Sequence, residues 1–216
     1  MNEYTADMPV SDPLLSRRPS RPAAALPLLD DAPDLCLAKA RVHEACGPAR
    51  RTLAVWLAAQ TTGPLIWVAP SWTQDQLNAD GLRDWIDPAR LIFVHPRRAE
   101  DVLWTMEEVL RAGAVPLAVA DLPGLPGLTQ VRRMHLAAET GAREGMHAPT
   151  GLLLTPGQGG AAGVETRWHL APSHADGPEG WCLDRLRART APRRSWQIVR
   201  GGENKAPRIR PGIKTA

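Results

Sequence analysis

The sequence predicts an α/β fold, in which a mostly parallel sheet is flanked by helices and followed by a C-terminal antiparallel β meander. Between residues 40 and 154, short apolar runs alternate with stretches whose apolar residues recur at helical spacing. After residue 164, three segments alternate apolar and polar residues and are joined by turns rich in proline and glycine. A chain of 216 residues that is 44% hydrophobic is long enough for one domain with a substantial core.

Each element follows from its local pattern. The parallel strands are predicted at 40–46, 65–69, 91–94, 115–120 and 152–154, three of them as continuous apolar runs of the kind buried on both faces. Helices are predicted at 50–61, 73–85, 98–111 and 128–140, and Gly113 stands at the C-cap position of the third. The meander strands are predicted at 165–171, 181–187 and 195–200.

The two ends of the chain differ from this middle part. Residues 1–33 contain six prolines and few large apolar side chains, so we expect a disordered leader that buries too little surface to offset its ordering entropy. Residues 201–216 combine glycines, prolines and charges, and we expect a basic disordered tail. The ordered domain is therefore predicted over 34–200.

The charged residues exclude two kinds of chemistry. The only lysines are Lys39, Lys205 and Lys214, so the body of the chain has no lysine for a phosphate-binding loop or a Schiff base. Three widely spaced cysteines form no zinc motif and are expected to be free thiols. No apolar run approaches the ~18 residues of a membrane span, and the acidic start is unlike a signal peptide. We expect a cytoplasmic protein without a membrane partner.

A candidate nucleotide site lies where the strands end, the usual ligand position in this fold class. The first predicted strand is followed by Gly47 and Pro48, and then by a helix that carries Arg51 and Thr52. A later apolar strand ends at Asp121. This order is the layout of the Walker A turn and the Walker B carboxylate in phosphate-loop ATPases.

With this order of elements, the chain resembles the RecA-like ATPase core over about residues 40–200, so that 34–200 is identified as a RecA-like domain. Within that superfamily it is most similar to the ImuA family, which are accessory proteins of bacterial translesion synthesis. Two stretches carry the narrower resemblance. The first is Asn78–Val94, with Asp87-Pro88-Ala89-Arg90-Leu91 before a strand, and the second is Glu165–Pro172 followed by Trp181–Arg189 and Ser195–Val199.

The phosphate-binding loop departs from the working pattern G-x-x-x-x-G-K-[ST]. Arg51 stands at the lysine position, the loop is two residues shorter, and the second glycine is missing. Pro70-Ser71-Trp72 replaces the catalytic carboxylate of the family, and Thr155-Pro156 replaces its sensor glutamine. The resemblance therefore implies a vestigial site with no catalytic residue, metal or cofactor. Its residues are Gly47, Arg51, Thr52 and Asp121.

Candidate contact residues come from the tryptophans and arginines, which dominate the hot spots of protein interfaces. Trp72 and Trp85 lie in polar surroundings and are either partner anchors or packed under loops, whereas Trp56, Trp67 and Trp104 are predicted in the core. The strand at 181–187 continues into a basic stripe, which either contacts a phosphate backbone or faces solvent. Its residues are Arg185, Arg187, Arg189, Arg193 and Arg194, of which the first three alternate and are expected to share one face.

Two further patterns are predicted not to form sites. His43 and Glu44 are neighbours on a strand, so they point to opposite faces and cannot act together on one substrate. The loop Gly157–Gly163 is expected to be flexible, and it has no basic or aromatic residue with which to contact DNA.

The resemblance implies a non-catalytic accessory role in SOS-induced translesion DNA synthesis and mutagenesis. The expected partners are an ImuB-like Y-family protein, an error-prone polymerase and RecA itself, with DNA as a further contact. One alternative is a nucleotide-dependent ATPase or switch that binds ATP and Mg²⁺ weakly through Arg51, Thr52 and Asp121. Another is a SulA-like cell division inhibitor, which shares the reduced RecA-like fold and binds the tubulin-like division protein.

Overall fold

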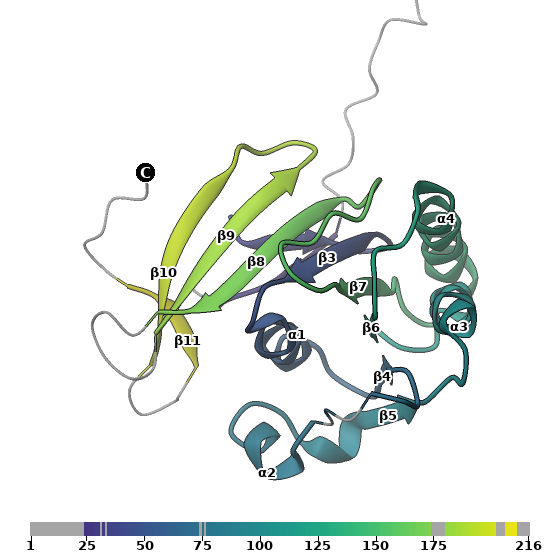
Figure 1. The fold of residues 1–216 in the computed structure, drawn as a ribbon, viewed down its shortest axis with the longest axis horizontal. Helices are drawn as coiled ribbons and strands as arrows, with labels where there is room; N and C mark the ends of the chain where they lie inside the picture. The colour runs from purple at the N-terminus through teal and green to yellow at the C-terminus, as the bar shows by residue number, and fades with distance from the viewer. Residues whose placement is uncertain are drawn as a thin grey trace, which may run out of the picture.

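The computed structural model describes residues 24–30, 32, 34–73, 75, 77–173, 180–201 and 206–210. Its main sheet has nine strands in the order β11-β10-β9-β8-β3-β7-β6-β4-β5 (Figure 1). The parallel part comprises β3 (Val42–Cys46), β4 (Leu65–Val68), β5 (Leu91–Val94), β6 (Leu117–Asp121), β7 (Thr150–Leu154) and β8 (Thr166–Pro172). The antiparallel part comprises β9 (Gly180–Ala188), β10 (Arg194–Arg200) and β11 (Pro207–Ile209). The predicted fold class is confirmed.

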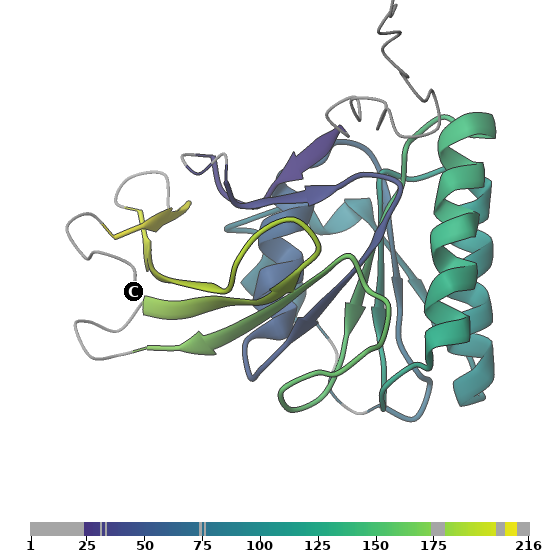
Figure 2. The ribbon, with the colours of Figure 1, turned by 90° about the horizontal axis from the view of Figure 1, so that it is seen from above.

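Helices cover both faces of the sheet. They are α1 (Arg50–Ala59), α2 (Ala79–Leu82), α3 (Ala99–Ala112) and α4 (Leu128–Glu144), with a 3₁₀ turn at Pro88–Arg90. Figure 2 shows α3 and α4 side by side on one face and α1 on the other. This arrangement divides the apolar interior into two clusters, one on each side of the sheet.

The two clusters are built by the apolar face of each helix. On the α1 side, the fully buried Trp56 and Leu57 pack with strand residues such as Leu65. On the other side, Met106 of α3 and Met134 of α4 pack over the opposite face of the strands. Burial of apolar surface on this scale, at roughly 25 cal/mol per Å², holds the layers together.

The predicted leader is wrong in its extent. Residues 25–27 form β1 (Ala25–Pro27), which pairs antiparallel with β2 (Cys36–Ala38). Leu26, Leu28 and Leu29 are buried in the α1-side cluster because the short ladder places this leucine-rich segment against it. The prediction of disorder for residues 1–23 lies outside the described residues.

The predicted tail is also too long. β11 extends the meander by pairing antiparallel with β10, and its Ile209 packs against the α1-side cluster. The free edge of β10 offers backbone hydrogen-bonding groups, which a short strand with one apolar side chain can use. Of residues 201–216, positions 202–205 and 211–216 lie outside the described residues.

Two further local predictions are wrong. Among its described residues, the polar stretch 73–85 forms the single helical turn of α2 and buries one side chain, that of Leu82, which is too little apolar surface to hold a longer helix in place. The apolar run of β5 is not buried on both faces: Ile92 is 49% exposed and Phe93 is 44% exposed, because β5 is the outermost strand of the sheet.

Helix α3 corrects the prediction for Trp104. Val102, Met106 and Leu110 follow one another at four-residue intervals and form its buried face. Trp104 stands half a turn away from them and is 59% exposed. The predicted C-cap at Gly113 is confirmed, with φ of +56°, a left-handed conformation that glycine adopts readily. Among the described helices, none is long and apolar enough to cross a membrane.

Candidate functional site

The turn between β3 and α1 occupies the place of a phosphate-binding loop, but its backbone donors are already engaged. The N–H of Gly47 donates to the carbonyl of Gly157 at 3.0 Å, and the N–H of Ala49 donates to the carbonyl of Leu170 at 3.0 Å. Pro48 has no N–H, and the N–H of Arg50 turns back to the Gly47 carbonyl at 3.3 Å. Residues 47–50 therefore offer no free N–H nest for a phosphate.

Gly47 is required at this turn for steric reasons. Its φ is +89°, and a Cβ atom there would lie 2.6 Å from the Leu170 carbonyl oxygen and 2.7 Å from Nε2 of His169. The turn is thus pressed against β8 by close backbone contact. The glycine that the sequence marks as the start of a phosphate loop serves here to pack the turn against its neighbouring strand.

Arg51 and Asp121 lie together, as the Walker layout predicts, but they bind each other. Nε of Arg51 donates to Oδ2 of Asp121 at 2.7 Å, and a guanidinium nitrogen of Arg50 lies 3.6 Å from Oδ1. The Asp121 side chain is only 5% exposed, whereas the two arginines are 25–26% exposed. Arg51 also lies 3.8 Å from the carboxylate of Asp75.

This arrangement does not fit a magnesium–triphosphate group. The carboxylate that would hold the ion through water is paired with two guanidinium groups, whose positive charges oppose a nearby Mg²⁺. Thr52, which stands at the magnesium-binding position, is partly buried in the first turn of α1. The described residues contain no group of three or more histidine, cysteine or acidic side chains that could hold a metal ion.

A small cavity of about 90 Å³ opens beside Arg51, at the carboxyl ends of β4 and β5. Trp67, Phe93 and His95 line it together with Arg51, and the rings of Phe93 and His95 stack with centroids 6.0 Å apart. Because a nucleotide needs several hundred Å³, the cavity is too small to hold one.

Glu44 is the most heavily bonded acid near this edge of the sheet, and the sequence did not reveal its role. It is fully buried, and its Oε1 accepts hydrogen bonds from the Thr155 hydroxyl at 2.7 Å and from the N–H groups of Gly160 and Ala161 at 2.8 and 3.0 Å. Its Oε2 pairs with Nε of Arg167. These donors are more than a hundred residues away along the chain, which is why a local pattern could not find them.

Glu44 thereby fixes the loop after β7, whose segment Gly157–Gly163 was predicted to be flexible. Two of the loop's N–H groups donate hydrogen bonds to the Glu44 carboxylate, and Arg167 donates a further hydrogen bond to the Ala161 carbonyl at 3.0 Å. The loop is anchored by a buried charge, because its glycines allow the backbone to turn around that charge.

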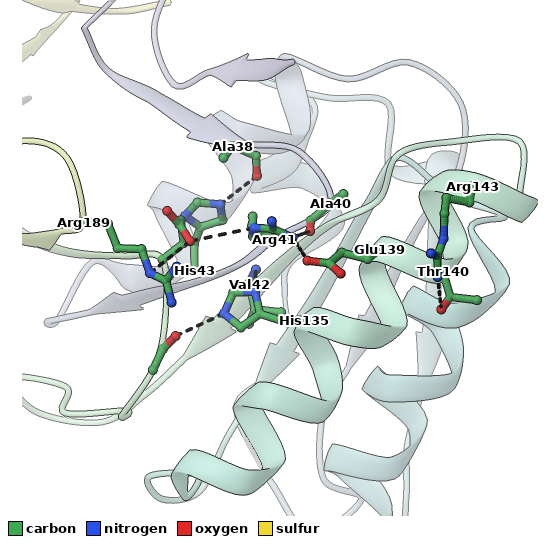
Figure 3. A network of polar contacts seen from close by, with 12 residues as sticks. Ala38, Ala40, Arg41, Val42, His43, His135, Glu139, Thr140, Arg143 and Arg189 are labelled. Atoms are coloured by element: carbon green, nitrogen blue, oxygen red, sulfur yellow. Dashed lines mark hydrogen bonds and ion pairs between the residues drawn. The ribbon is translucent and has the colours of Figure 1, made fainter. Parts of the chain in front are cut away.

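His43 points to the opposite side of β3 from Glu44, as predicted. Its Nε2–H donates to the Ala38 carbonyl at 2.9 Å, and its Nδ1 accepts from the hydroxyl of Thr166 at 2.7 Å (Figure 3 draws the Ala38 contact). Complete burial lowers the pKa of His43 from 6.5 to about 4. The imidazole is therefore a neutral structural group at neutral pH.

The five arginines of the predicted basic stripe differ in their exposure to solvent. Arg185 is only 8% exposed, and its guanidinium lies over the rings of both Trp168 and Trp196, 5.7 and 5.2 Å from their centroids. Arg185 follows the buried Leu183 at two-residue spacing and pairs with Trp168, so it faces the core. The register of β8 and β9 shifts between Arg167 and Trp168, so that Arg187 pairs with Arg167 and lies on the opposite face. The remaining arginines of the stripe are exposed: Arg187, Arg189, Arg193 and Arg194.

The two tryptophans considered as partner anchors also differ. Trp72 is 49% exposed in the loop after β4. Trp85 is partly buried, packs against the α1-side cluster and lies 6.2 Å from Trp56, centroid to centroid, with Arg200 above its ring. Trp85 is therefore mainly a packing residue, while Trp72 keeps a free aromatic surface.

Comparison of the chain with protein-family models finds no matching family, and a search of curated proteins finds no significant match.

Proposed function

We propose that this protein is a non-catalytic, RecA-like accessory protein of SOS-induced translesion DNA synthesis. In this role it scaffolds an ImuB-like Y-family protein and an error-prone polymerase, with RecA and DNA as further contacts. The observation that carries the proposal is the ion pair between Arg51 and Asp121. Both residues occupy the positions expected of a nucleotide site, and each neutralises the other.

The state of the turn supports the same role. Since the N–H groups of Gly47 and Ala49 are bonded to protein carbonyls, phosphate binding requires the turn to leave β8. Breaking several hydrogen bonds and an ion pair opposes binding, whereas a scaffold needs only the outer surface of the fold. The alternative of an ATP-dependent switch is disfavoured by this cost.

A nucleotide titration tests the first half of the proposal. We expect tryptophan fluorescence to show no saturable binding of ATP with Mg²⁺ up to about 1 mM, and no hydrolysis. Trp67 lines the cavity beside Arg51, so the signal is placed to report on this site. Micromolar binding that is lost in Asp121→Ala, and kept in the exposed-carboxylate control Asp80→Ala, would overturn the vestigial site.

A partner test addresses the second half and separates it from the SulA-like alternative. The purified protein is tested for binding to an ImuB-like protein, an error-prone polymerase, RecA and the tubulin-like division protein. We expect the first two to bind and Trp72→Ala to weaken at least one of them about tenfold. Trp104→Ala is the matched control, since Trp104 is equally free on α3. Binding to the division protein alone would replace the proposed function.

A further inference from the structure

An open groove of about 630 Å³ runs between α4 and the end of the meander, on the α3–α4 side of the fold. One wall is a stripe of α4 in which Leu128, Arg132 and Leu136 follow one another at four-residue intervals. Facing them are Arg187 and Arg189, from the end of β9 and the turn after it. The groove is separate from the Arg51–Asp121 pair and shares no residue with it.

The helical wall is unusually apolar for a solvent-facing surface. Leu128 is 43% exposed and Leu136 is 63% exposed, whereas Val131 and Met134 of the same helix are buried in the core. Exposed leucines that are aligned on one helix face, with polar residues around them, are typical of a surface that a partner covers.

The groove also has unbalanced positive charge. Its two carboxylates are already neutralised. Glu139 pairs with Arg41 at 2.5 Å (Figure 3), and Glu165 lies 3.6 Å from Arg189 and 3.9 Å from Arg41. Arg132 and Arg187 line the same groove and are exposed, and the described residues provide no ion pair for either of them. Two guanidinium groups therefore remain available to an anionic ligand.

His135 adds no charge to this surface. Its Nδ1 accepts a hydrogen bond from the N–H of Val42 at 3.3 Å, and its Nε2–H donates to the carbonyl of Gly163 at 3.1 Å, which engages both ring nitrogens in the neutral form (Figure 3). Burial lowers its pKa, consistent with this arrangement. The charge of the groove is thus set by its arginines and its two paired carboxylates.

We propose that this groove binds an acidic, leucine-rich peptide segment of a partner protein. Apolar side chains of the segment pack on Leu128 and Leu136, while its carboxylates form paired hydrogen bonds with Arg132 and Arg187. A single-stranded nucleic acid fits less well, because none of the described residues that line the groove is a tryptophan, tyrosine or phenylalanine on which a base could stack. The assignment goes beyond the proposed function and holds whichever protein supplies the segment.

The test uses the full chain and a short fluorescein-labelled peptide in which pairs of leucines alternate with pairs of glutamates. We expect fluorescence anisotropy to give a Kd of about 10 μM that weakens as salt is raised. Arg132→Glu and Arg187→Glu should each weaken binding by about tenfold, and Leu136→Ser by several-fold because it removes apolar contact.

Matched control variants distinguish binding in this groove from non-specific electrostatic or apolar binding elsewhere on the surface. Arg97→Glu reverses an exposed arginine beyond β5, and Met146→Ser removes an 82% exposed apolar side chain after the end of α4; both should leave the Kd within about twofold. Unchanged circular dichroism shows that each variant is folded. Failure of the peptide to bind, or equal loss in the controls, would overturn the proposal. Tight binding of a thymidine oligonucleotide that is lost in Arg132→Glu and Arg187→Glu, without peptide binding, would overturn it in favour of nucleic acid.

Discussion

Glu44 on β3 and Asp121 on β6 are both buried acidic residues that pair with arginine near the carboxyl edge of the same sheet, yet they differ in the groups that bond them. Glu44 is fully buried, and its carboxylate is satisfied by one hydroxyl, two backbone N–H groups and Arg167. Among the described residues, Asp121 is bonded by the side chains of Arg51 and Arg50, which are partly exposed. Of the two, the sequence pointed only to Asp121.

The difference shows that a motif position and a structural requirement are separate properties. Asp121 stands where a Walker B carboxylate stands, but two partly exposed arginines hold it in place of an ion. Glu44 belongs to no motif, but it joins β3, the loop after β7 and β8 through one buried charge. Removing a carboxylate is costly where its partners stay buried and uncompensated, and less costly where its partners can turn to water.

The largest expected effect is at Glu44. Glu44→Gln leaves the 18% exposed Arg167 guanidinium without its counter-charge and weakens the bonds that anchor the loop. We expect the free energy of unfolding to fall by about 3 kcal/mol or more, measured by urea denaturation at pH 7. The control Glu108→Gln removes a 47% exposed partner of Arg111 and should change the value by less than about 0.5 kcal/mol. Equal effects of the two variants would contradict the role of Glu44.

The next effect concerns the other face of β3. The folded state holds His43 neutral down to a pKa of about 4, while the unfolded chain takes up this proton near pH 6.5. Since the unfolded state binds more protons between these values, the free energy of unfolding falls as the pH is lowered from 6.5 towards 4, by about 3 kcal/mol at most from this group.

Urea denaturation at several pH values between 7 and 4.5 measures this dependence. His43→Gln keeps a donor and an acceptor without a titrating group, so the difference between the two proteins should widen in favour of the variant as the pH falls. Parallel curves for the two proteins would show that His43 does not contribute.

A smaller effect is expected at Asp121. Asp121→Asn leaves two arginines that can turn to water, since each is about a quarter exposed. We expect a loss of about 1 kcal/mol in the free energy of unfolding, after allowance for solvent screening. A double-mutant cycle with Arg51→Ala isolates the pairing energy. A loss as large as that of Glu44→Gln would make the two carboxylates equivalent and break the comparison.

The smallest effect is expected from restoring the lysine of the motif. Arg51→Lys should give no saturable ATP binding up to about 1 mM, because the N–H groups of Gly47 and Ala49 remain bonded to Gly157 and Leu170. Titration followed by tryptophan fluorescence measures this. Micromolar affinity of Arg51→Lys for ATP would show that the Arg51 side chain alone, and not the backbone of the turn, prevents ATP binding.

Local pattern predicted much of the fold because each helix and interior strand carries its own periodicity. The wrong predictions share a cause. Trp104 and the apolar run of β5 were assigned to the core because each lies in a locally apolar segment, although exposure depends on which face or edge of an element meets a neighbour. Arg185 and Arg187 were expected from alternation to share one face, but the register shift between β8 and β9 places them on opposite faces.

The sequence by itself determined the α/β class, the glycine at the turn after β3, and the alignment of Arg51 with Asp121. These depend on residues close together in the chain or on the order of elements along it. Only the tertiary structure decided that the turn's N–H groups are bonded to Gly157 and Leu170, that Glu44 anchors a distant loop, and that Leu128 and Leu136 face arginines of the meander. Each of these contacts joins residues that are far apart in the sequence, so no local pattern predicts it. Only the folded chain brings the residues close together.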